Sequence, residues 1–303
     1  MDDIRMDLFN EDCFTMFPKI LDKSVDFFLL DLPYANKKFG KCTSCKWDSP
    51  IDLERMWIEI KRTMKPTAMI AFFCNTKFGF ALIESNPKFF SHDLIWKKSR
   101  KVGFLSANKQ QLRQHENIYI FKDKCGTYNP QKTTRDKDYK HSGKRSSEEH
   151  YGGVLKCKKE YKKEDGMFPT SVIEIEPELK DKTCYQVHKD IQYAKTRADP
   201  KGLEPRHPTS IIDIEDMPAE NTILDYKNPY RTIHRTQKPV DLYEYLIKTY
   251  TNEGDVVCDF TMGSGTACIG CINTNRQFVG CELDNEIFNI AKERIDKHIL
   301  DKK

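Results

Sequence analysis

The stretch with the clearest chemical content is Asp31-Leu32-Pro33-Tyr34, which directly follows the apolar run 25–30. Five apolar residues among six are typical of a buried strand, and Pro33 ends it because proline has no N–H for a sheet ladder. Ligands bind at the carboxyl ends of strands in open α/β sheets. We therefore expect Asp31 and Tyr34 at such a rim, where they could act on a ligand; an ordinary surface loop is the alternative.

A second stretch, Gly263-Ser264-Gly265-Thr266, lies between an apolar run at 255–260 and a helical segment that continues to about residue 275. Glycines let the backbone bend tightly and approach a ligand closely. The following helix start offers unpaired N–H groups and positive potential. Glu282 ends the next apolar run, where a carboxylate can accept hydrogen bonds from ribose hydroxyls. This pattern predicts a nucleotide-like cofactor site.

The kind of cofactor is narrowed by what the glycine stretch lacks. A dinucleotide fingerprint requires a third glycine at the position held by Cys268. Asp259 and Phe260, just before the stretch, also suit a cofactor without a pyrophosphate. A nicotinamide-dependent oxidoreductase is therefore the least favoured enzyme class.

Strand and helix patterns alternate along both ends of the chain. We expect strands at 25–30, 68–74, 89–96, 117–121, 255–260 and 277–282, and helices at 51–60, 77–85, 239–253, 266–275 and 284–300. Pro66 would end the first helix, Pro239 would take the first position of the third, and Gly254 would close that third helix. Such alternation predicts an α/β fold with a mostly parallel central sheet and helices on both faces.

Residues 125–230 interrupt this alternation with charged and turn-forming sequence. Basic clusters occur here among tyrosines, including Lys137 to Arg145 and Lys156 to Lys163. Charge runs most often form a solvated surface, but basic residues interleaved with tyrosines also suit a nucleic-acid backbone and stacked bases. Both interpretations stay open from this segment alone.

Composition excludes several classes of protein. The net charge of +4 permits a polyanionic partner without requiring one. The 11 cysteines are too dispersed for a small disulfide scaffold, and Cys42-Thr43-Ser44-Cys45 has no second pair to complete a zinc site, so no metal is expected. No signal peptide or membrane-spanning run is apparent. These features fit a cytoplasmic or similar intracellular setting and no membrane partner.

Taken together, the two stretches resemble the signatures of the S-adenosylmethionine-dependent DNA amino-methyltransferases, which modify adenine N6 or cytosine N4. Asp31 to Tyr34 is similar to their Asp-Pro-Pro-Tyr motif, and the glycine loop after Phe260 resembles their Phe-x-Gly-x-Gly loop. The order, with the catalytic motif first, resembles the circularly permuted beta group. Three further segments are similar to that group: Asn10-Glu11-Asp12-Cys13, His115-Glu116-Asn117 and Thr236-Gln237-Lys238-Pro239.

This resemblance implies a Rossmann-like methyltransferase fold with an inserted target-recognition region. The implied divisions are 1–124 for the catalytic half, 125–230 for the insertion and 231–303 for the cofactor half. The implied catalytic residues are Asp31, Leu32, Pro33 and Tyr34. The implied contacts of S-adenosylmethionine are Asp12, Cys13, Asp31, Thr236, Lys238, Asp259, Phe260, Gly263, Ser264, Gly265, Thr266 and Glu282.

The catalytic roles follow from the chemistry of an exocyclic amine. Its lone pair is delocalised into the ring, so Asp31 and a backbone carbonyl at position 32 would accept its N–H bonds and stabilise the developing positive charge. Tyr34 would stack on a base extruded from the duplex. Leu32 stands where the family commonly has proline, which removes φ rigidity but keeps the carbonyl.

We therefore predict a site-specific DNA methyltransferase acting on adenine N6 in double-stranded DNA. Cytosine N4 is the nearest alternative, followed by RNA or protein-amide methylation and by a nucleic-acid-binding protein with a degenerate cofactor fold. A homodimer and a cognate restriction nuclease remain open as partners.

Overall fold

A computed structural model describes residues 4–35, 38, 40, 41, 43, 45, 48–133, 139–140, 160–162, 164, 166–173 and 237–302. Most of the basic insertion, including Lys156 to Lys159, lies outside these residues, as does Thr236. In chain order the elements are β1 (Met6–Phe9), α1 (Cys13–Met16), η1 (Phe17–Lys19), β2 (Val25–Leu30), α2 (Leu53–Thr63), β3 (Met64–Cys74), α3 (Thr76–Ser85), β4 (Phe90–Val102), η2 (Phe104–Ser106), β5 (Arg113–Lys122), β6 (Tyr139–Lys140), β7 (Glu160–Tyr161), β8 (Val172–Ile173), α6 (Val240–Tyr250), β9 (Val256–Asp259), α7 (Thr266–Asn273), β10 (Gln277–Cys281) and α8 (Asn285–Asp301).

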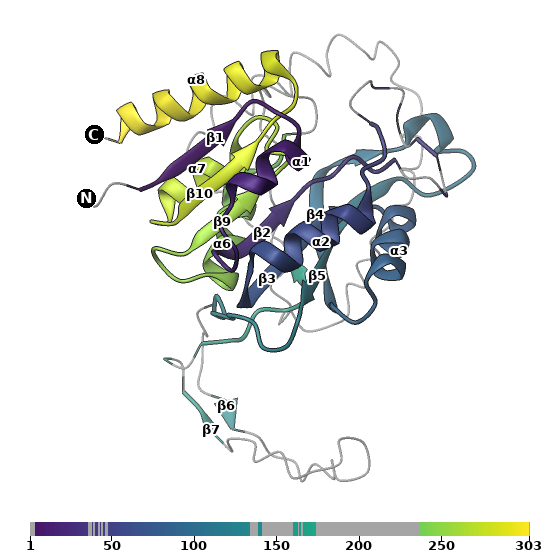
Figure 1. Ribbon diagram of the computed structural model, residues 1–303. Helices are drawn as coiled ribbons and strands as arrows, with labels where there is room; N and C mark the ends of the chain where they lie inside the picture. The colour runs from purple at the N-terminus through teal and green to yellow at the C-terminus, as the bar shows by residue number, and fades with distance from the viewer. Residues whose placement is uncertain are drawn as a thin grey trace.

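The central sheet has the strand order β1-β10-β9-β2-β3-β5-β4-β8 (Figure 1). Adjacent strands are parallel except where β5 runs antiparallel to both β3 and β4. The predicted mostly parallel α/β sheet is thus confirmed. A separate two-stranded ladder joins β6 to β7.

Two hydrophobic layers hold helices on opposite faces of this sheet. Strand β2 contributes to both layers, because Phe27 and Leu29 face one side and Phe28 and Leu30 the other, and all four are fully buried. The first layer packs α6, α7 and α8, and the second packs α1, α2 and α3. Burial of both faces explains why β2 is apolar at five of its six positions and does not alternate between polar and apolar residues.

Strand β2 lies beside β9, although their sequences are at opposite ends of the chain. Phe27 pairs with Val257 and Phe28 with Cys258. At the amino end, Asp26 Oδ2 accepts hydrogen bonds from Val256 N at 2.9 Å and Lys65 Nζ at 2.7 Å, which ties β9 and β3 to β2. At the carboxyl end, this pairing brings the residues that follow β2 next to those that follow β9.

Two local expectations about proline need correction. Pro66 was expected to mark the end of a helix before a strand at 68–74, but α2 ends at Thr63 and β3 already includes Pro66. The register of β3 against β2 is irregular between Met64 and Met69, so no ladder hydrogen bond is required of Pro66. Pro239 is the N-cap of α6 and not its first residue.

No helix in the described part of the chain is long and apolar enough to cross a membrane.

Strands β9 and β10 approach each other closely at Gly280. A Cβ at this position would lie 2.6 Å from the backbone oxygen of Asp259. We predict that Gly280→Ala lowers the free energy of unfolding by about 1–3 kcal/mol, because the backbone has to move to relieve the overlap. Urea denaturation would measure this loss.

Gly254→Ala provides the control, since its Cβ would meet no atom within 4 Å and only its φ of +82° is strained. That variant should lose about 1 kcal/mol. A Gly280→Ala variant as stable as the wild type would contradict the close approach.

Candidate active site

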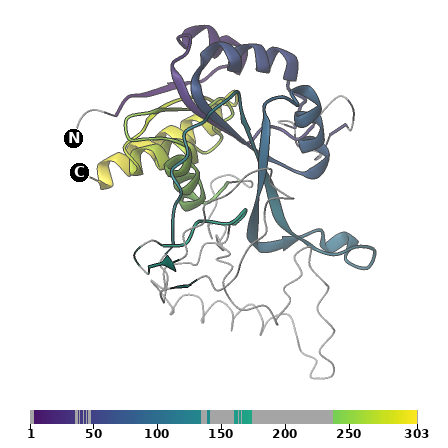
Figure 2. The same ribbon diagram turned by 90° about the horizontal axis from the view of Figure 1, so that it is seen from below.

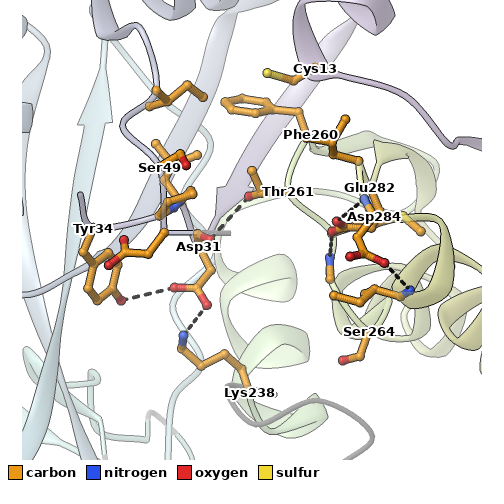
Figure 3. A pocket seen from close by; sticks show the side chains of 18 of the residues that line it. Cys13, Asp31, Tyr34, Ser49, Lys238, Phe260, Thr261, Ser264, Glu282 and Asp284 are labelled. Carbon is orange, nitrogen blue, oxygen red and sulfur yellow. Dashed lines mark hydrogen bonds and ion pairs between the residues drawn. The ribbon is translucent and has the colours of Figure 1, made fainter. Parts of the chain in front are cut away.

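A cavity of about 1050 Å³ opens where β2, β9 and β10 end (Figure 3). The close-up shows Asp31, Tyr34 and Lys238 on one side and Ser264, Glu282 and Asp284 on the other. Residues from both ends of the chain therefore line one space, as the carboxyl-edge argument predicts.

The loop after β2 presents Asp31 and Tyr34 to this cavity. The Tyr34 hydroxyl donates to Asp31 Oδ1 at 3.2 Å, and the Tyr34 ring stacks on Phe78 with centroids 5.5 Å apart and planes at 23°. Leu32 is only 2% exposed and packs among core residues. The family commonly has a proline at this position, which restricts φ. Here the burial of the Leu32 side chain holds the loop in place instead.

A cluster of buried charges surrounds Asp31. Lys238 Nζ donates a short hydrogen bond to Asp31 Oδ2 and lies 3.6 Å from Glu116 Oε1. The Tyr34 hydroxyl also donates to Glu116 Oε1, and Lys98 Nζ lies 2.5 Å from Glu116 Oε2. Two carboxylates and two ammonium groups therefore balance in charge, and Tyr34 connects the carboxylates with its single hydroxyl proton.

The pKa values within the cluster move in different directions. Burial raises the pKa of the Asp31 carboxyl, and although Lys238 opposes this effect, Glu116 adds to it and the result is a raised pKa. Burial also acts on Glu116, but Lys238 and Lys98 outweigh it and lower that pKa to about 2. Asp31 is therefore the carboxylate that takes up a proton first as the pH falls.

Lys238 and Tyr34 keep their protons at neutral pH. Burial by itself lowers the pKa of Lys238, but Asp31 and Glu116 outweigh burial and raise the pKa above its ordinary value. Burial raises the pKa of Tyr34 well above its ordinary value, and both carboxylates add to the shift. Both side chains consequently act as donors towards the carboxylates.

The opposite wall of the cavity is formed by the glycine loop and Glu282. Gly265 has φ +75°, and a Cβ there would lie 2.9 Å from Cδ1 of Ile295 in α8. The glycine therefore permits both the turn into α7 and the close packing of α8. Glu282 Oε2 accepts from Gly263 N at 3.0 Å, and Oε1 accepts from Asp284 N at 3.0 Å.

Ser264 and Thr266 are both buried and are connected to α8 through one arginine. Arg294 Nη1 donates to Ser264 O at 2.8 Å and lies 3.1 Å from Thr266 Oγ1. Both residues line the cavity. The loop is thus held by an arginine of α8 that lies 28 residues after Thr266 and 30 after Ser264.

Asp259 and Phe260 lie at the end of β9 in two different environments. Asp259 is buried, which raises its pKa to about 8, and its Oδ1 accepts from Thr261 N at 3.0 Å. Phe260 lines the cavity and packs its ring 5.1 Å from that of Phe17. Of the two, only Phe260 lines the cavity.

One motif comparison requires correction. Thr261 and Met262 separate Phe260 from Gly263, which is one residue more than in a Phe-x-Gly-x-Gly loop. Thr261 therefore occupies the aromatic position of that motif. Its hydroxyl donates to the backbone oxygen of Asp31 at 3.4 Å, so it connects the two chain ends directly beside the cavity.

Asp12 and Cys13 border the same cavity as Phe260, and Cys13 lies near Phe260 in the close-up (Figure 3). Asp12 caps α1 by accepting from Phe14 N at 2.8 Å, and Cys13 is buried with its thiol pKa raised to about 12. Both line the cavity. Asn10, two residues before Asp12, donates to the backbone oxygen of Glu282 at 2.8 Å, which fixes this segment against the end of β10.

Sequence patterns missed part of the charge cluster. Glu116 and Lys98 were not among the predicted site residues, although His115-Glu116-Asn117 was noted as a familiar segment. Lys238 was predicted on the cofactor side, and the structure has it against Asp31. Thr236 lies outside the described residues. Among those described, no group of His, Cys, Asp or Glu side chains could hold a metal ion.

Comparisons with known proteins first identify the fold. The M1.HpyAVI–SAM complex superimposes with a TM-score of 0.54 at 19% identity, covering 96% of this chain and 99% of that one. The PvuII DNA methyltransferase, described as cytosine-N4-specific, superimposes with a TM-score of 0.56 at 12% identity, covering 97% and 91%. The fold is thus the Rossmann-like α/β fold of methyltransferases.

The chain belongs to the DNA methylase family of N6 and N4 methyltransferases, whose profile matches residues 25–293. Members of this family are S-adenosylmethionine-dependent DNA amino-methyltransferases, as the sequence motifs predicted. The type II methyltransferase M1.MboII of Moraxella bovis is 26% identical over 92% of both chains. M.HpaI of Haemophilus parainfluenzae is 45% identical over 73 residues, which span only 23% of that protein.

The lowered pKa of Glu116 has a consequence for stability. A carboxyl whose folded pKa is about 2, against an ordinary 4.5, stabilises the fold above pH 4.5 and loses that contribution as the pH falls towards 2. We predict that Glu116→Gln is less stable than the wild type at neutral pH and that the difference shrinks as the pH falls through this window. Urea denaturation at several pH values would measure it.

Glu286→Gln, at an exposed position in the first turn of α8, provides the control. A stability difference for Glu116→Gln that is independent of pH would show that the Glu116 carboxylate is not stabilised by its lysines.

Proposed function

We propose that this protein transfers a methyl group from S-adenosylmethionine to N6 of an adenine that has been extruded from double-stranded DNA. The observation that carries the proposal is the position of Asp31, which faces a large cavity whose opposite wall is the glycine loop and Glu282. Membership of the DNA methylase family supports the reaction class.

The cofactor would be held by the wall that carries the glycine loop. When bound, S-adenosylmethionine supplies an electrophilic methyl group on a sulfonium. Glu282 would accept hydrogen bonds from the ribose hydroxyls, since each of its oxygens has only one backbone donor among the described contacts. Asp12, Cys13 and Phe260 would border the adenine, and Gly263 leaves room for close approach. This donor and acceptor set fits the cofactor.

Asp31 would act on the target amine. Its carboxylate accepts an N–H bond of the amine, which increases electron density on the nitrogen and stabilises the positive charge that develops there. The methylated nitrogen must lose one proton, and Asp31 is the carboxylate positioned to take it. Tyr34 would stack on the extruded base. The opposite face of that ring is already supported by Phe78, so the stacking surface is fixed in advance.

The choice of adenine over cytosine rests on the donors around Asp31. Adenine has a ring nitrogen acceptor on each side of its amine, N1 and N7, whereas cytosine has only N3. Two lysine ammonium groups, Lys238 and Lys98, line this part of the cavity. Two ammonium donors match the two ring-nitrogen acceptors of adenine better than the single acceptor of cytosine.

The remaining assignments are part of the same proposal. The insertion at 125–230 would recognise the target sequence, between a catalytic half at 1–124 and a cofactor half at 231–303. The names of the relatives as type II methyltransferases favour a restriction-modification role. A cognate nuclease would then cut the same sequence when it is unmethylated.

The central test is Asp31→Ala. This variant should lose methyl transfer by roughly 100-fold or more, because the amine loses its acceptor, while S-adenosylmethionine binding measured by calorimetry stays within a few-fold. The wild type would be incubated with DNA and labelled cofactor, and the modified nucleoside identified by mass spectrometry. N6-methyl-2′-deoxyadenosine is expected, and N4-methyl-2′-deoxycytidine would assign the alternative base.

Asp296→Ala, an exposed carboxylate of α8, is the matched control and should be fully active. Unchanged turnover in Asp31→Ala would remove the proposed role of the aspartate, and label found only in RNA or protein would remove DNA as the substrate.

The pH dependence of the rate should depend on Lys238. Asp31 acts as an acceptor only when ionised, so the rate falls as the pH drops through its raised pKa. Lys238 lowers that pKa, and Lys238→Met should therefore move the acidic limb of the kcat profile to higher pH. The matched control is Lys248→Met in α6, whose ammonium pairs with Glu244 at 3.4 Å on the surface of the helix. An identical shift in both variants, or none in Lys238→Met, would contradict the coupling.

A further inference from the structure

The β4–β5 hairpin carries an exposed apolar tip that the proposed reaction does not yet use. Phe104 is 65% exposed and Leu105 fully exposed at 105%, and they are adjacent in the short helix η2. Figure 2 shows this tip projecting away from the other described elements. Two neighbouring large apolar side chains at the end of a projection are unfavourable in water unless a partner covers them.

The base of the same hairpin forms part of the candidate active site. Trp96, Lys98 and Val102 of β4 and Glu116 of β5 line the cavity. Trp96 pairs with Glu116, and Val102 pairs with Arg113. Because β4 has extra residues between Lys97 and Val102, these two pairs are only three residues apart along β5, about 10 Å at the usual strand rise. The tip therefore begins at the mouth of the cavity.

The hairpin is anchored where it leaves the sheet. Leu112 is buried, and Arg113 Nη2 donates to Thr76 Oγ1 at 3.0 Å at the start of α3. A hairpin with an anchored base and an apolar end can insert that end into another molecule and keep its own conformation.

The charge of the hairpin indicates which molecule that is. Between Asp93 and Glu116 the sequence has six Lys or Arg residues and no Asp or Glu. Lys101 and Lys109, on either side of the tip, would contact phosphates. A protein surface would have no need of such uniform positive charge, whereas DNA combines a polyanionic backbone with an apolar base stack.

We propose that Phe104 and Leu105 form a wedge that enters the DNA base stack beside the target nucleotide and fills the space left by the extruded base. Apolar side chains inserted between base steps stabilise unstacked DNA. This inference rests on the proposed function, because it requires a target base that leaves the duplex.

The test compares two duplexes that contain the methylated sequence, which is mapped beforehand with the wild-type protein. One duplex is fully paired, and the other has an abasic position opposite the target, so that extrusion costs less. Phe104→Ala and Leu105→Ala should lower kcat/KM on the paired duplex by about 10-fold or more. On the abasic duplex the loss should be within about 3-fold, because the base is already partly unstacked.

Leu300→Ala is the matched control, because Leu300 in the last turn of α8 is 69% exposed, close to Phe104, and the variant should change neither value. An equal loss on both duplexes, or no loss on either, would overturn the wedge. A wild-type dimer that becomes monomeric in the tip variants would assign the surface to a second copy and would also overturn it.

Failure of the underlying function gives a different result. A wild-type protein that methylates neither duplex nor any other DNA would remove the proposed function and the wedge together. A wild type that methylates both duplexes, with tip variants that behave identically to it, would remove the wedge alone.

Discussion

The pairing of β2 with β9 is the interaction on which the candidate site depends. It brings Asp31 next to Thr261, whose hydroxyl contacts the Asp31 backbone, although 230 residues separate them. Asp26 secures the same pair of strands at the opposite end of β2. If the pairing slipped by one residue, side chains would exchange faces and the buried run of β2 would no longer match both helix layers.

The charge cluster explains how an ionisable acceptor can be kept in a buried position. A lone buried carboxylate would be neutral at ordinary pH, because desolvation strongly disfavours its charged form. Lys238 and Lys98 offset this penalty for Asp31 and Glu116 together, and Asp31 keeps the higher carboxyl pKa of the two. Asp31, the proposed acceptor, is therefore the carboxylate of the cluster that is protonated more readily.

Much of the architecture follows from the sequence, because buried parallel strands leave unmistakable apolar runs. Residues 25–30, 255–260 and 277–282 are such runs, and the edge that they share determines where Asp31, Gly263 and Glu282 meet. Glu116 could not be predicted in this way. Its position depends on β5 running antiparallel beside β3, and nothing in the local pattern of β5 encodes that direction.

The partner of Lys238 was also beyond sequence reasoning. A lysine in a polar loop next to a proline most often lies in solvent, and only the path of the chain into α6 turns this one towards Asp31. Similarly, the position of Thr261 in the glycine loop becomes meaningful only when the backbone of Asp31 is seen beside it. Motif spacing alone assigned that place to Phe260.

The permuted order of the two halves also has a kinetic consequence. Strand β2 emerges early during synthesis, but its neighbour β9 is made only when the final sixth of the chain appears. Until then one edge of β2 is unpaired and apolar, which is a state prone to association with other chains. Closing a loop of this length makes the central pairing a slow, late event. Asp31, the proposed acceptor for the base amine, is therefore translated long before β9 and becomes part of a site only after β9 has been made.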